Sequence, residues 1–479
     1  MMPQKNLRIP FDEVLPDSLD ELTDWVIGEA NPYGALALHS FVNDKLKNKL
    51  EHILFENRRL LYVFAMAQYT PGSVLNVLAS EPNEQLQLRV LKNPNTTANT
   101  LEKLYKNESS KKFIELIASH PNTSSDVLEK IEWQGSEKIR AALSSNSNTP
   151  LTVIKKLLID SSLNEKKIIA RHPELNSEIL EILWNEGDEY LRAEVVSHSE
   201  CPERLIVKAI KSRHVIERQK LASNPVIGDV IRYRLLIDEE PRVRAAIVKS
   251  QEVSEDELNK LCEDSSEQVR RNEARRKGLS EYVETQFVND DDVWVRRWLA
   301  RNAVTSDKVL EKLAIDEDEN VRRSVARNKS CPKRLLGKLA DDDSAWVRAG
   351  IALRSDISKE VLLKLANDQN IDIQSAIGIN PITPVKILKR LAKNSDRDVR
   401  RSVILNENVT GKVLELFVEE PYPLNRIILA SRKKCNRQTR WRLANDPDNE
   451  VRFSAIRFFA KQMFKTTIWR DNDENTRCN

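Results

Sequence analysis

The sequence predicts an all-α protein, an α-solenoid built from short repeats of two helices each. The first observation is a pattern that recurs every 26 residues from Phe113 to Val451 without an insertion or a deletion. The second is that apolar positions within the pattern follow helical spacing rather than strand-like alternation. The third is composition, because 31% of residues are charged and only 11 are glycine, so tight hairpins are scarce. Stacked repeats need a constant path length per unit, which explains the unbroken register.

The N-terminal segment, residues 1–60, does not fit the repeat and is expected to form a helical cap. A cap is needed because the first unit of a stack exposes an apolar face. Ser18–Ile27 is expected to be a short helix with Ser18 as its N-cap. The sequence Asn31-Pro32-Tyr33-Gly34 predicts a break, and Phe41–Phe64 predicts a longer amphipathic stretch.

The repeats themselves are expected over residues 61–450, as about 14–16 units of 26 residues. Weak units begin near Leu61 and Leu86, and the regular units follow in strict register. Their first residues, each counted as position zero, are Phe113, Ile139, Glu165, Leu191, Glu217, Val243, Val269, Val295, Val321, Val347, Ile373, Val399, Asn425 and Val451.

The first helix of each unit carries apolar residues at positions zero and plus four, as in Val321 and Val325, with Glu273 as an exception. Position plus five is usually small, which lets neighbouring helices approach closely: Ala118, Ala170, Ala222, Ala274, Ala300, Ala326, Ala352 and Ala430. Asparagine or histidine dominates position plus seven. These residues are expected to end the helix, because asparagine tolerates the left-handed conformation and bonds local backbone groups. They are Asn93, His120, Asn146, His172, His198, Asn224, Asn302, Asn328, Asn380 and Asn406.

The second helix begins at position plus eleven, where serine, threonine, asparagine or proline supplies an N-cap or first-turn residue. Apolar residues follow at helical spacing, as in Leu335, Leu336 and Leu339. Neither helix is long enough to be stable alone, so stability must come from stacking. Residues 451–470 are expected to form a C-terminal capping helix, and residues 471–479 a disordered tail.

The order of these columns resembles the leucine-rich repeat variant family. The likeness is carried by NPNTTANTLEKLY (Asn93–Tyr105), HPNTSSDVLEKI (His120–Ile131) and VRRSVARNKSCPKRLLGKLADD (Val321–Asp342), and it covers Leu61 to the C-terminus. The resemblance implies a right-handed superhelix in which an α-helix alternates with a shorter, often 3₁₀, helix. The present unit of 26 residues is slightly longer than the usual family repeat. The first helix is therefore expected to be a fuller α-helix, as in HEAT-like repeats.

No cofactor is expected from the resemblance. The iron–sulfur member of the family carries a module of clustered cysteines, whereas the five cysteines here are scattered. Few and odd-numbered cysteines also predict no disulfide or metal framework and fit a reducing, cytoplasmic compartment. They are Cys201, Cys262, Cys331, Cys435 and Cys478.

Composition and motifs argue against several other classes of function. The net charge is only +3, from 76 basic and 73 acidic residues, so any nucleic-acid footprint has to be local. The N-terminus lacks a signal-peptide pattern, and no apolar run is long enough to span a membrane. His120, His172 and His198 fall in the asparagine column, so a helix-ending role is favoured over metal binding. Without a nucleophile–base pair or a glycine-rich phosphate loop, the protein is not expected to be an enzyme.

Position plus one is arginine in most units, and an acidic residue lies six positions upstream. A row of arginines could follow phosphates, but a structural ladder of ion pairs, such as Arg322 with Asp316, explains both columns. The basic residues are Arg140, Lys166, Arg192, Arg218, Arg244, Arg270, Arg296, Arg322, Arg348, Arg400, Arg426 and Arg452. The acidic residues are Asp160, Glu186, Asp238, Asp264, Asp290, Asp316, Asp342, Glu420 and Asp446.

A second arginine set is the candidate partner-binding surface. Positions plus two and plus six share one helix face and hold residues such as Ala193 and Ser197 in most units. In three consecutive units both are arginine, and tryptophans accompany them. Packing cannot require arginine where other units accept alanine, and close like charges repel unless a partner answers them. The predicted surface is Arg271, Arg275, Arg297, Arg301, Arg323, Arg327, Trp294 and Trp298.

Four further residues lie in the same or adjoining units, namely Arg276, Arg354, Arg401 and Trp346. The competing interpretation is a solvated charged face that is neutralised by Asp290–Asp292 and Asp341–Asp343. The sequence thus favours a non-enzymatic scaffold that binds a protein partner along one face and has no membrane segment. The alternative is binding of DNA or RNA phosphates through the arginine-rich face.

Overall fold

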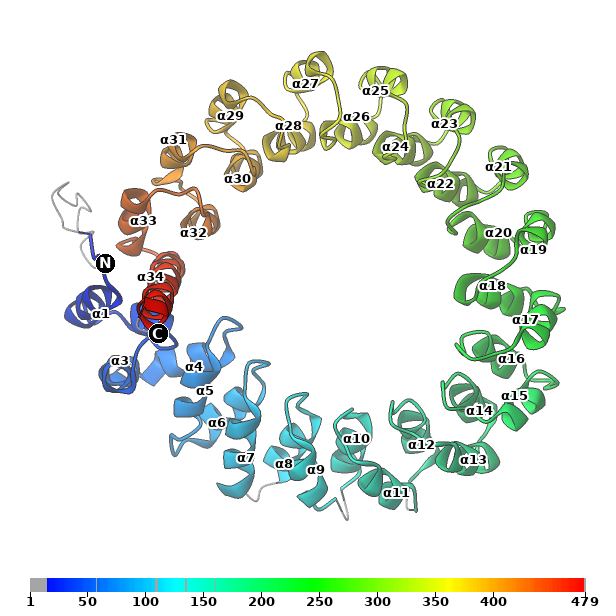
Figure 1. Cartoon of the computed structure of the whole chain (residues 1–479), viewed down its shortest axis with the longest axis horizontal. Helices are drawn as coiled ribbons and strands as arrows, with labels where there is room; N and C mark the ends of the chain where they lie inside the picture. The colour runs from blue at the N-terminus through cyan, green and yellow to red at the C-terminus, as the bar shows by residue number, and fades with distance from the viewer. Residues whose placement is uncertain (1–14, 57, 108–110, 134–135, 160, 478–479) are drawn as a thin grey trace. The chain divides into compact units, whose positions relative to one another are not determined.

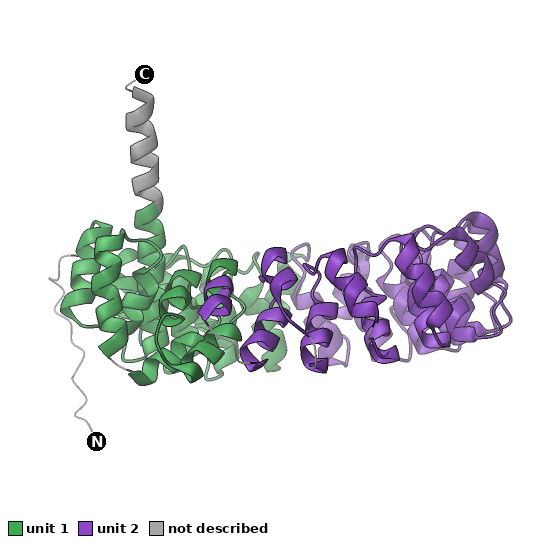
Figure 2. Cartoon of the chain, turned by 90° about the horizontal axis from the view of Figure 1, so that it is seen from below, with its two compact units in different colours: residues 1–100, 358–479 green, residues 101–357 purple. Residues whose placement is uncertain are grey.

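The computed structural model describes residues 15–56, 58–107, 111–133, 136–159 and 161–477, with side chains up to residue 464. Within this part of the chain there are 34 α-helices, one 3₁₀ segment (η1, Glu415–Phe417) and no strand. The predicted all-α solenoid class is confirmed. The chain divides into two compact units, residues 1–100 with 358–479 (unit 1) and residues 101–357 (unit 2), shown in Figure 2.

Unit 2 contains most of the regular repeats. Its even-numbered helices are the first helices of the repeats: α8 (Lys111–Ser119), α10 (Glu137–Ser145), α12 (Leu163–Ile169), α14 (Glu189–Val196), α16 (Val215–Leu221), α18 (Pro241–Ser250), α20 (Glu267–Ala274), α22 (Val293–Arg301), α24 (Glu319–Arg327) and α26 (Ala345–Ala352). Its odd-numbered helices are the second helices: α9 (Ser125–Lys130), α11 (Leu151–Ile159), α13 (Ser177–Glu186), α15 (Glu203–Ala209), α17 (Asp229–Leu236), α19 (Glu255–Leu261), α21 (Glu281–Phe287), α23 (Asp307–Leu313) and α25 (Lys333–Leu339). Helix α7 (Ala98–Asn107) spans the division between the units.

Unit 2 curves, with its even-numbered helices on the concave side and its odd-numbered helices on the convex side (Figure 1). The small residues at position plus five explain why the even-numbered helices lie on the inner side of the curve. Ala300, Ala326 and Ala352 are fully buried, as the sequence predicts, so consecutive even-numbered helices pack closely. The concave surface is therefore formed by the exposed faces of the even-numbered helices.

Both helices of a repeat are α-helical, including the nine residues of α22 and the seven of α23. The fuller first helix expected from the repeat length is confirmed. The 3₁₀ alternation implied by the family resemblance is not found in the described residues, where η1 is the single 3₁₀ segment. Position plus eleven supplies N-caps as predicted, and Ser254, Ser280 and Pro332 all precede their helices.

The asparagine column ends the first helices without the left-handed conformation that the sequence predicted. Asn302 and Asn328 are C-caps with φ of −67° and −69°, which is extended backbone. The Nδ2 group of Asn328 donates to the carbonyls of Ala300 at 2.9 Å and Asn302 at 2.8 Å, both in the preceding repeat. Its Oδ1 accepts from the backbone N–H of Ser330 at 2.8 Å. The column is thus an amide ladder between repeats, which also includes Asn93, Asn146, Asn224 and Asn406.

Unit 1 contains both ends of the sequence. Its N-terminal helices are α1 (Leu19–Gly28), α2 (Pro32–Leu38), α3 (Asp44–Glu56), α4 (Arg58–Met66), α5 (Gly72–Leu78) and α6 (Glu84–Leu91). Its C-terminal helices are α27 (Lys359–Leu365), α28 (Ile371–Ile379), α29 (Val385–Leu391), α30 (Arg397–Leu405), α31 (Gly411–Leu414), α32 (Pro423–Ser431), α33 (Arg437–Ala444) and α34 (Asn449–Arg477).

The two ends of the sequence pack against each other within unit 1. Helix α34 packs on α2, and the rings of Trp25 and Trp441 are 4.6 Å apart. The rings of Tyr69 and Phe453 are also 4.6 Å apart. The N-terminal helices therefore cover the end of the last repeat, and the last helix covers them in turn.

The N-terminal helices differ from prediction in two places. Ser18 caps α1 as predicted, but Asn31 caps α2 and Pro32 is its first residue. The chain does break between α1 and α2, but at residues 29–31 and not over the whole of Asn31–Gly34, because proline fits the first turn of a helix. The stretch Phe41–Phe64 contains two helices, α3 and α4. Helix α34 continues to Arg477, past residue 470 where the predicted capping helix ends, and residues 478–479 of the predicted tail lie outside the described part.

Candidate partner-binding surface

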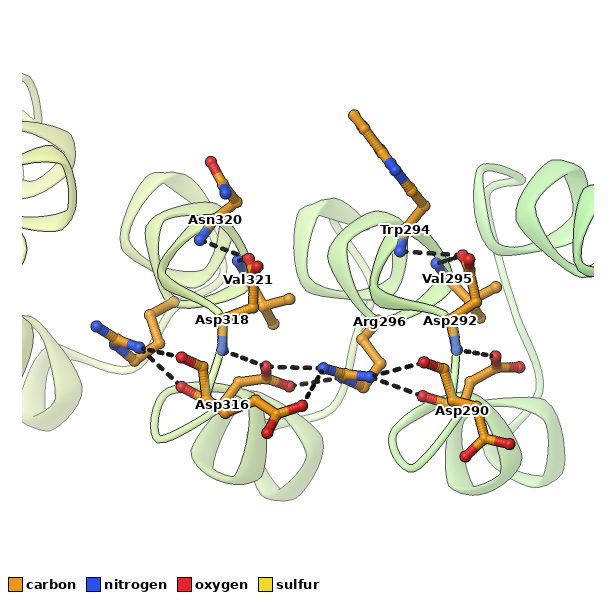
Figure 3. Close-up of polar contacts among 12 residues, drawn as sticks. Asp290, Asp292, Trp294, Val295, Arg296, Asp316, Asp318, Asn320 and Val321 are labelled. Atoms are coloured by element: carbon orange, nitrogen blue, oxygen red, sulfur yellow. Dashed lines mark hydrogen bonds and ion pairs between the residues drawn. The ribbon is translucent and has the colours of Figure 1, made fainter.

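The arginines at position plus one form a ladder of ion pairs beside the N-terminal ends of the even-numbered helices (Figure 3). The Nε and Nη2 groups of Arg296 donate to the two carboxylate oxygens of Asp316 at 2.8 and 3.1 Å. Its Nη1 donates to the main-chain carbonyl of Asp290 at 2.9 Å. Arg296 thereby joins the loops that precede α22 and α24, and its hydrogen-bond donors are used within the fold.

The observed pairing corrects the predicted partner within this ladder. Arg322 donates to the carboxylate of Asp342 at 2.8 and 3.0 Å, and only to the backbone carbonyl of Asp316. The carboxylate of Asp316 is already bound to Arg296. Burial raises the pKa of Asp342, but hydrogen bonds from Arg322 and the Ser344 N–H outweigh it and lower that pKa. The same pairing joins Arg218 to Asp238, Arg244 to Asp264, Arg270 to Asp290, Arg400 to Glu420 and Arg426 to Asp446.

A second aspartate caps the next helix at the starts of α22 and α24. Asp292 accepts from the N–H groups of Trp294 and Val295 at 3.0 and 3.1 Å. Asp318 does the same for Asn320 and Val321 at the start of α24. The side chains of Trp294 and Asn320 point away from the ladder (Figure 3). The position before each repeat start thus lies on the exposed face of its helix.

The four arginines at positions plus two and plus six of α22 and α24 lie on that face and form no ion pair. We call Arg297, Arg301, Arg323 and Arg327 the arginine cluster. The side chains of Arg297 and Arg323 are half-buried, and their Nε groups have no hydrogen-bond partner. Burial lowers the pKa of Arg323, and the nearby charges of Arg327, Arg297 and Arg301 lower it further. The charge of Glu319 acts in the opposite direction on Arg323, but the cluster remains a group of close like charges without an ion pair.

Tryptophans hold these guanidinium groups in place. The Cζ atom of Arg297 lies 4.6 Å from the ring centre of Trp294, and that of Arg301 lies 4.9 Å from Trp298. Both distances are typical of cation–π contacts. These contacts fix the positions of the guanidinium groups without supplying a negative charge.

Neighbouring repeats extend the stacking on both sides of the cluster. Arg275, at the end of α20, lies 4.5 Å from the ring of Trp298, and Arg323 lies 4.9 Å from Trp346. Gly350 of α26 leaves room for the cluster, since a Cβ there would lie 3.3 Å from the Cγ of Arg327. Trp346, which the sequence places in the adjoining unit, occupies the same column as Trp294.

The competing interpretation, a face neutralised by nearby aspartates, applies to one arginine. Arg271 donates to the carboxylate of Asp292 at 2.9 and 2.5 Å, and these bonds raise its pKa. Asp290 is bound to Arg270 and Asp342 to Arg322, so these two carboxylates are engaged in the ladder. The predicted surface therefore consists of a paired Arg271, a stacked Arg275 and the unpaired arginine cluster.

The other arginines noted in the sequence have structural contacts instead. Arg276 donates to the carbonyls of Val248 and Gln251 at 2.6 and 2.7 Å. Arg354 is largely buried and pairs with Asp356. Arg401 lies in unit 1, where it pairs with Asp398 and stacks on Tyr422.

Groups that could support chemistry are not assembled in the described part of the chain. No group of three His, Cys, Asp or Glu side chains there could hold a metal ion. The four described cysteines are free and buried, and burial raises the pKa of Cys201 to about 12. Among the described helices, none is both long and apolar enough to cross a bilayer.

Fold and surface together define a helical repeat protein, an α-solenoid with a cationic, tryptophan-lined patch on the concave side of unit 2. No protein-family model matches the chain, and no curated protein does.

Several solved structures are similar to the chain. A leucine-rich repeat variant with a novel repetitive motif is 23% identical, with a TM-score of 0.35, over 46% of this chain and 87% of that one. UNC-45 from Drosophila melanogaster is 11% identical, with a TM-score of 0.27, over 94% of this chain and 85% of that one. Kap121p bound to Pho4p is 11% identical, with a TM-score of 0.21, over 89% and 48%. At these low TM-scores none of them assigns the chain to a family.

Proposed function

We propose that this protein is a cytoplasmic scaffold without catalytic activity, which binds a protein partner through the concave face of unit 2. The observation that carries the proposal is the arginine cluster, whose four guanidinium groups form no ion pair. Arg297 and Arg323 are half-buried, and close like charges reduce stability, whereas equivalent positions in other repeats hold Ala193 or Ser197. A partner that supplies negative charge would give these side chains a role that the fold does not.

The rest of the polar chemistry supports a structural rather than a catalytic role. The plus-one arginines and the asparagines are used in ladders between repeats. The described cysteines are buried with raised pKa values, which disfavours thiolate chemistry and fits a reducing compartment. Extended concave surfaces are what repeat proteins of this kind use for binding.

Quantitative affinity capture from the native host tests this function. The first variant replaces the cluster (Arg297→Gln, Arg301→Gln, Arg323→Gln and Arg327→Gln). The matched control removes four exposed charges from α23 and α25 of the same repeats (Lys308→Gln, Lys312→Gln, Lys333→Gln and Lys338→Gln). Circular dichroism and thermal unfolding check that both variants fold.

We expect one or more proteins to be enriched with the wild type and the lysine control, and to be lost with the cluster variant. The same set of proteins with all three baits would contradict a binding role for this face.

Binding of DNA or RNA is the second candidate function, because unpaired guanidinium groups also suit phosphates. A salt titration of oligonucleotide binding tests it. Phosphate binding requires measurable affinity at low salt, a steep loss with rising salt and a loss in the cluster variant. Affinity that is absent at low salt, or equal in the wild type and the cluster variant, excludes this candidate.

A further inference from the structure

We propose that the arginine cluster binds an extended acidic peptide segment of the partner, whose carboxylates pair with the free guanidinium groups. This inference rests on the proposed function and names the chemistry of the partner. Apolar side chains of the same segment would contact the exposed rings of Trp294 and Trp346, which are 44% and 53% accessible.

One arginine at an equivalent repeat position already binds a carboxylate within the structure. Arg271 occupies the same repeat position as Arg297 and Arg323, and it binds both carboxylate oxygens of Asp292. The planar guanidinium group matches a carboxylate with two parallel hydrogen bonds. Asp318 occupies the equivalent position for Arg297 but caps α24 and is not bonded to that arginine, and Arg323 has Ser344 there instead. The Nε donors of Arg297 and Arg323 are left without a partner. An acidic side chain from outside would complete the arrangement that Asp292 provides internally.

Stacking on tryptophan prepares the cluster for binding. Arg297, Arg301 and Arg323 each lie within 5 Å of an indole ring centre, so their orientations are already restricted. A pre-oriented side chain loses less conformational freedom when a ligand binds. Trp298 carries the guanidinium groups of both Arg275 and Arg301, which leaves less of that ring for a base of single-stranded nucleic acid.

The extent of the cluster fits a peptide better than a long phosphate track. Packed helices lie about 10 Å apart, so α20 to α26 span roughly 30 Å, the length of about nine extended residues. The equivalent positions on either side of the arginine-bearing helices are Ala245 and the exposed Lys249 in α18, and Ala349 and the exposed Leu353 at α26. A mixed surface of guanidinium, indole and aliphatic groups suits alternating acidic and apolar side chains.

Fluorescence anisotropy with defined probes tests the inference on the full-length protein. The probes are fluorescein-labelled nonaglutamate, the matching glutamine peptide and a labelled oligothymidylate of equal charge. Each is titrated at low salt into the wild type, the cluster variant and the lysine control. We expect the glutamate peptide to bind the wild type and the lysine control alike, and the cluster variant at least about tenfold more weakly. Tryptophan fluorescence should change on binding, because Trp294 and Trp346 border the cluster.

Three results would overturn the inference: no binding of the glutamate peptide, equal binding to the cluster variant, or tighter cluster-dependent binding of the oligothymidylate. The proposed function is judged separately by the capture experiment. A host protein that depends on the cluster, together with no affinity for nonaglutamate, would leave the scaffold function standing and remove the acidic peptide. A tighter oligothymidylate complex would instead support the phosphate alternative.

Discussion

Glu273 is a single residue that departs from the repeat and carries a measurable consequence. It occupies the apolar plus-four position of α20, is fully buried, and neither carboxylate oxygen has a hydrogen-bond partner. Burial raises its pKa from 4.5 to about 9, although the charge of Arg276 acts in the opposite direction. The folded protein therefore holds Glu273 protonated at neutral pH, whereas the unfolded chain ionises it.

This difference predicts a pH-dependent stability. Between pH 4.5 and about 9 the unfolded state binds fewer protons at Glu273, so its contribution to stability falls as pH rises across that window. Replacing Glu273 with Leu should stabilise the protein by roughly 2–3 kcal/mol near neutral pH and remove this slope. Urea unfolding across the pH range measures both effects. The control Glu267→Gln, at an exposed position of α20, should keep the slope, and an unchanged slope in Glu273→Leu would contradict the assignment.

Other residues show what a column pattern can and cannot predict. The pattern correctly places Asn328 at a helix end, because most repeats have asparagine or histidine at this position. It could not reveal that the amide bonds carbonyls of the preceding repeat, since that contact depends on the distance between stacked units. Likewise, nothing in the sequence distinguishes Arg271, which finds Asp292, from Arg297, which finds no carboxylate.

At the scale of helices, the small plus-five column sets how closely consecutive first helices approach. Gly378 occupies this column in α28, beside Ser402 of α30. A Cβ at Gly378 would lie 1.8 Å from the Oγ of Ser402 and 3.0 Å from its Cβ. This contact leaves no room for a side chain without moving one helix or rotating Ser402.

Gly378→Ala should therefore destabilise the protein by about 1–3 kcal/mol, despite the higher helix propensity of alanine. Ser402→Gly in the same chain should recover most of the loss by restoring the space. Gly337→Ala in α25 is the matched control, since nothing lies within 4 Å of that Cβ, and it should not lower the unfolding midpoint. Equal effects of both alanine substitutions would show that helix contact does not limit position plus five.

The ion-pair ladder also belongs to this scale. The sequence correctly predicts an acid–arginine ladder, because both columns recur with the period. The partner of each arginine was misassigned, since Arg322 binds the carboxylate of Asp342 rather than that of Asp316. Asp316 is nearer to Arg322 along the chain, so the sequence favoured it as the partner. In the fold, the second helix of the repeat brings Asp342 next to Arg322 instead.

At the scale of the molecule, the repeat register is the property that the sequence determines most completely. Stacking gives the helices their stability, so each added unit has to present its apolar columns in phase. The sequence also predicted that both ends need covering. It did not predict that Trp25 and Trp441 would meet, because no repeat column relates the first helices to the last.

Register predicts how insertions behave. A second copy of Val321–Trp346 after Trp346 adds a complete 26-residue unit and should leave a soluble helical protein with cooperative urea unfolding. Insertion of only Val321–Ser330 shifts the columns by ten residues and should lower helicity and broaden the transition. Circular dichroism during urea titration compares the two. Equal cooperativity in both would count against a stack that depends on phase.

The location of the proposed binding surface was predictable in part. Arginine pairs at plus two and plus six stood out because other repeats tolerate small residues there, and the structure brings both pairs of α22 and α24 together with tryptophan rings. The role of tryptophan as a platform for guanidinium groups was not predictable. It depends on contacts between repeats, such as Arg323 over Trp346.

Site-specific photo-crosslinking in the native host tests most directly whether this concave face binds a protein. Asn320 is exposed at the start of α24, and its side chain points to the same side as Trp294 (Figure 3). Replacing Asn320 with p-benzoylphenylalanine should give a covalent, nuclease-resistant protein adduct that disappears when the arginine cluster is replaced by glutamine. The same probe at the exposed Lys333 of α25 should give none. Equal adducts from both positions, or a nuclease-sensitive adduct at Asn320, would contradict the account.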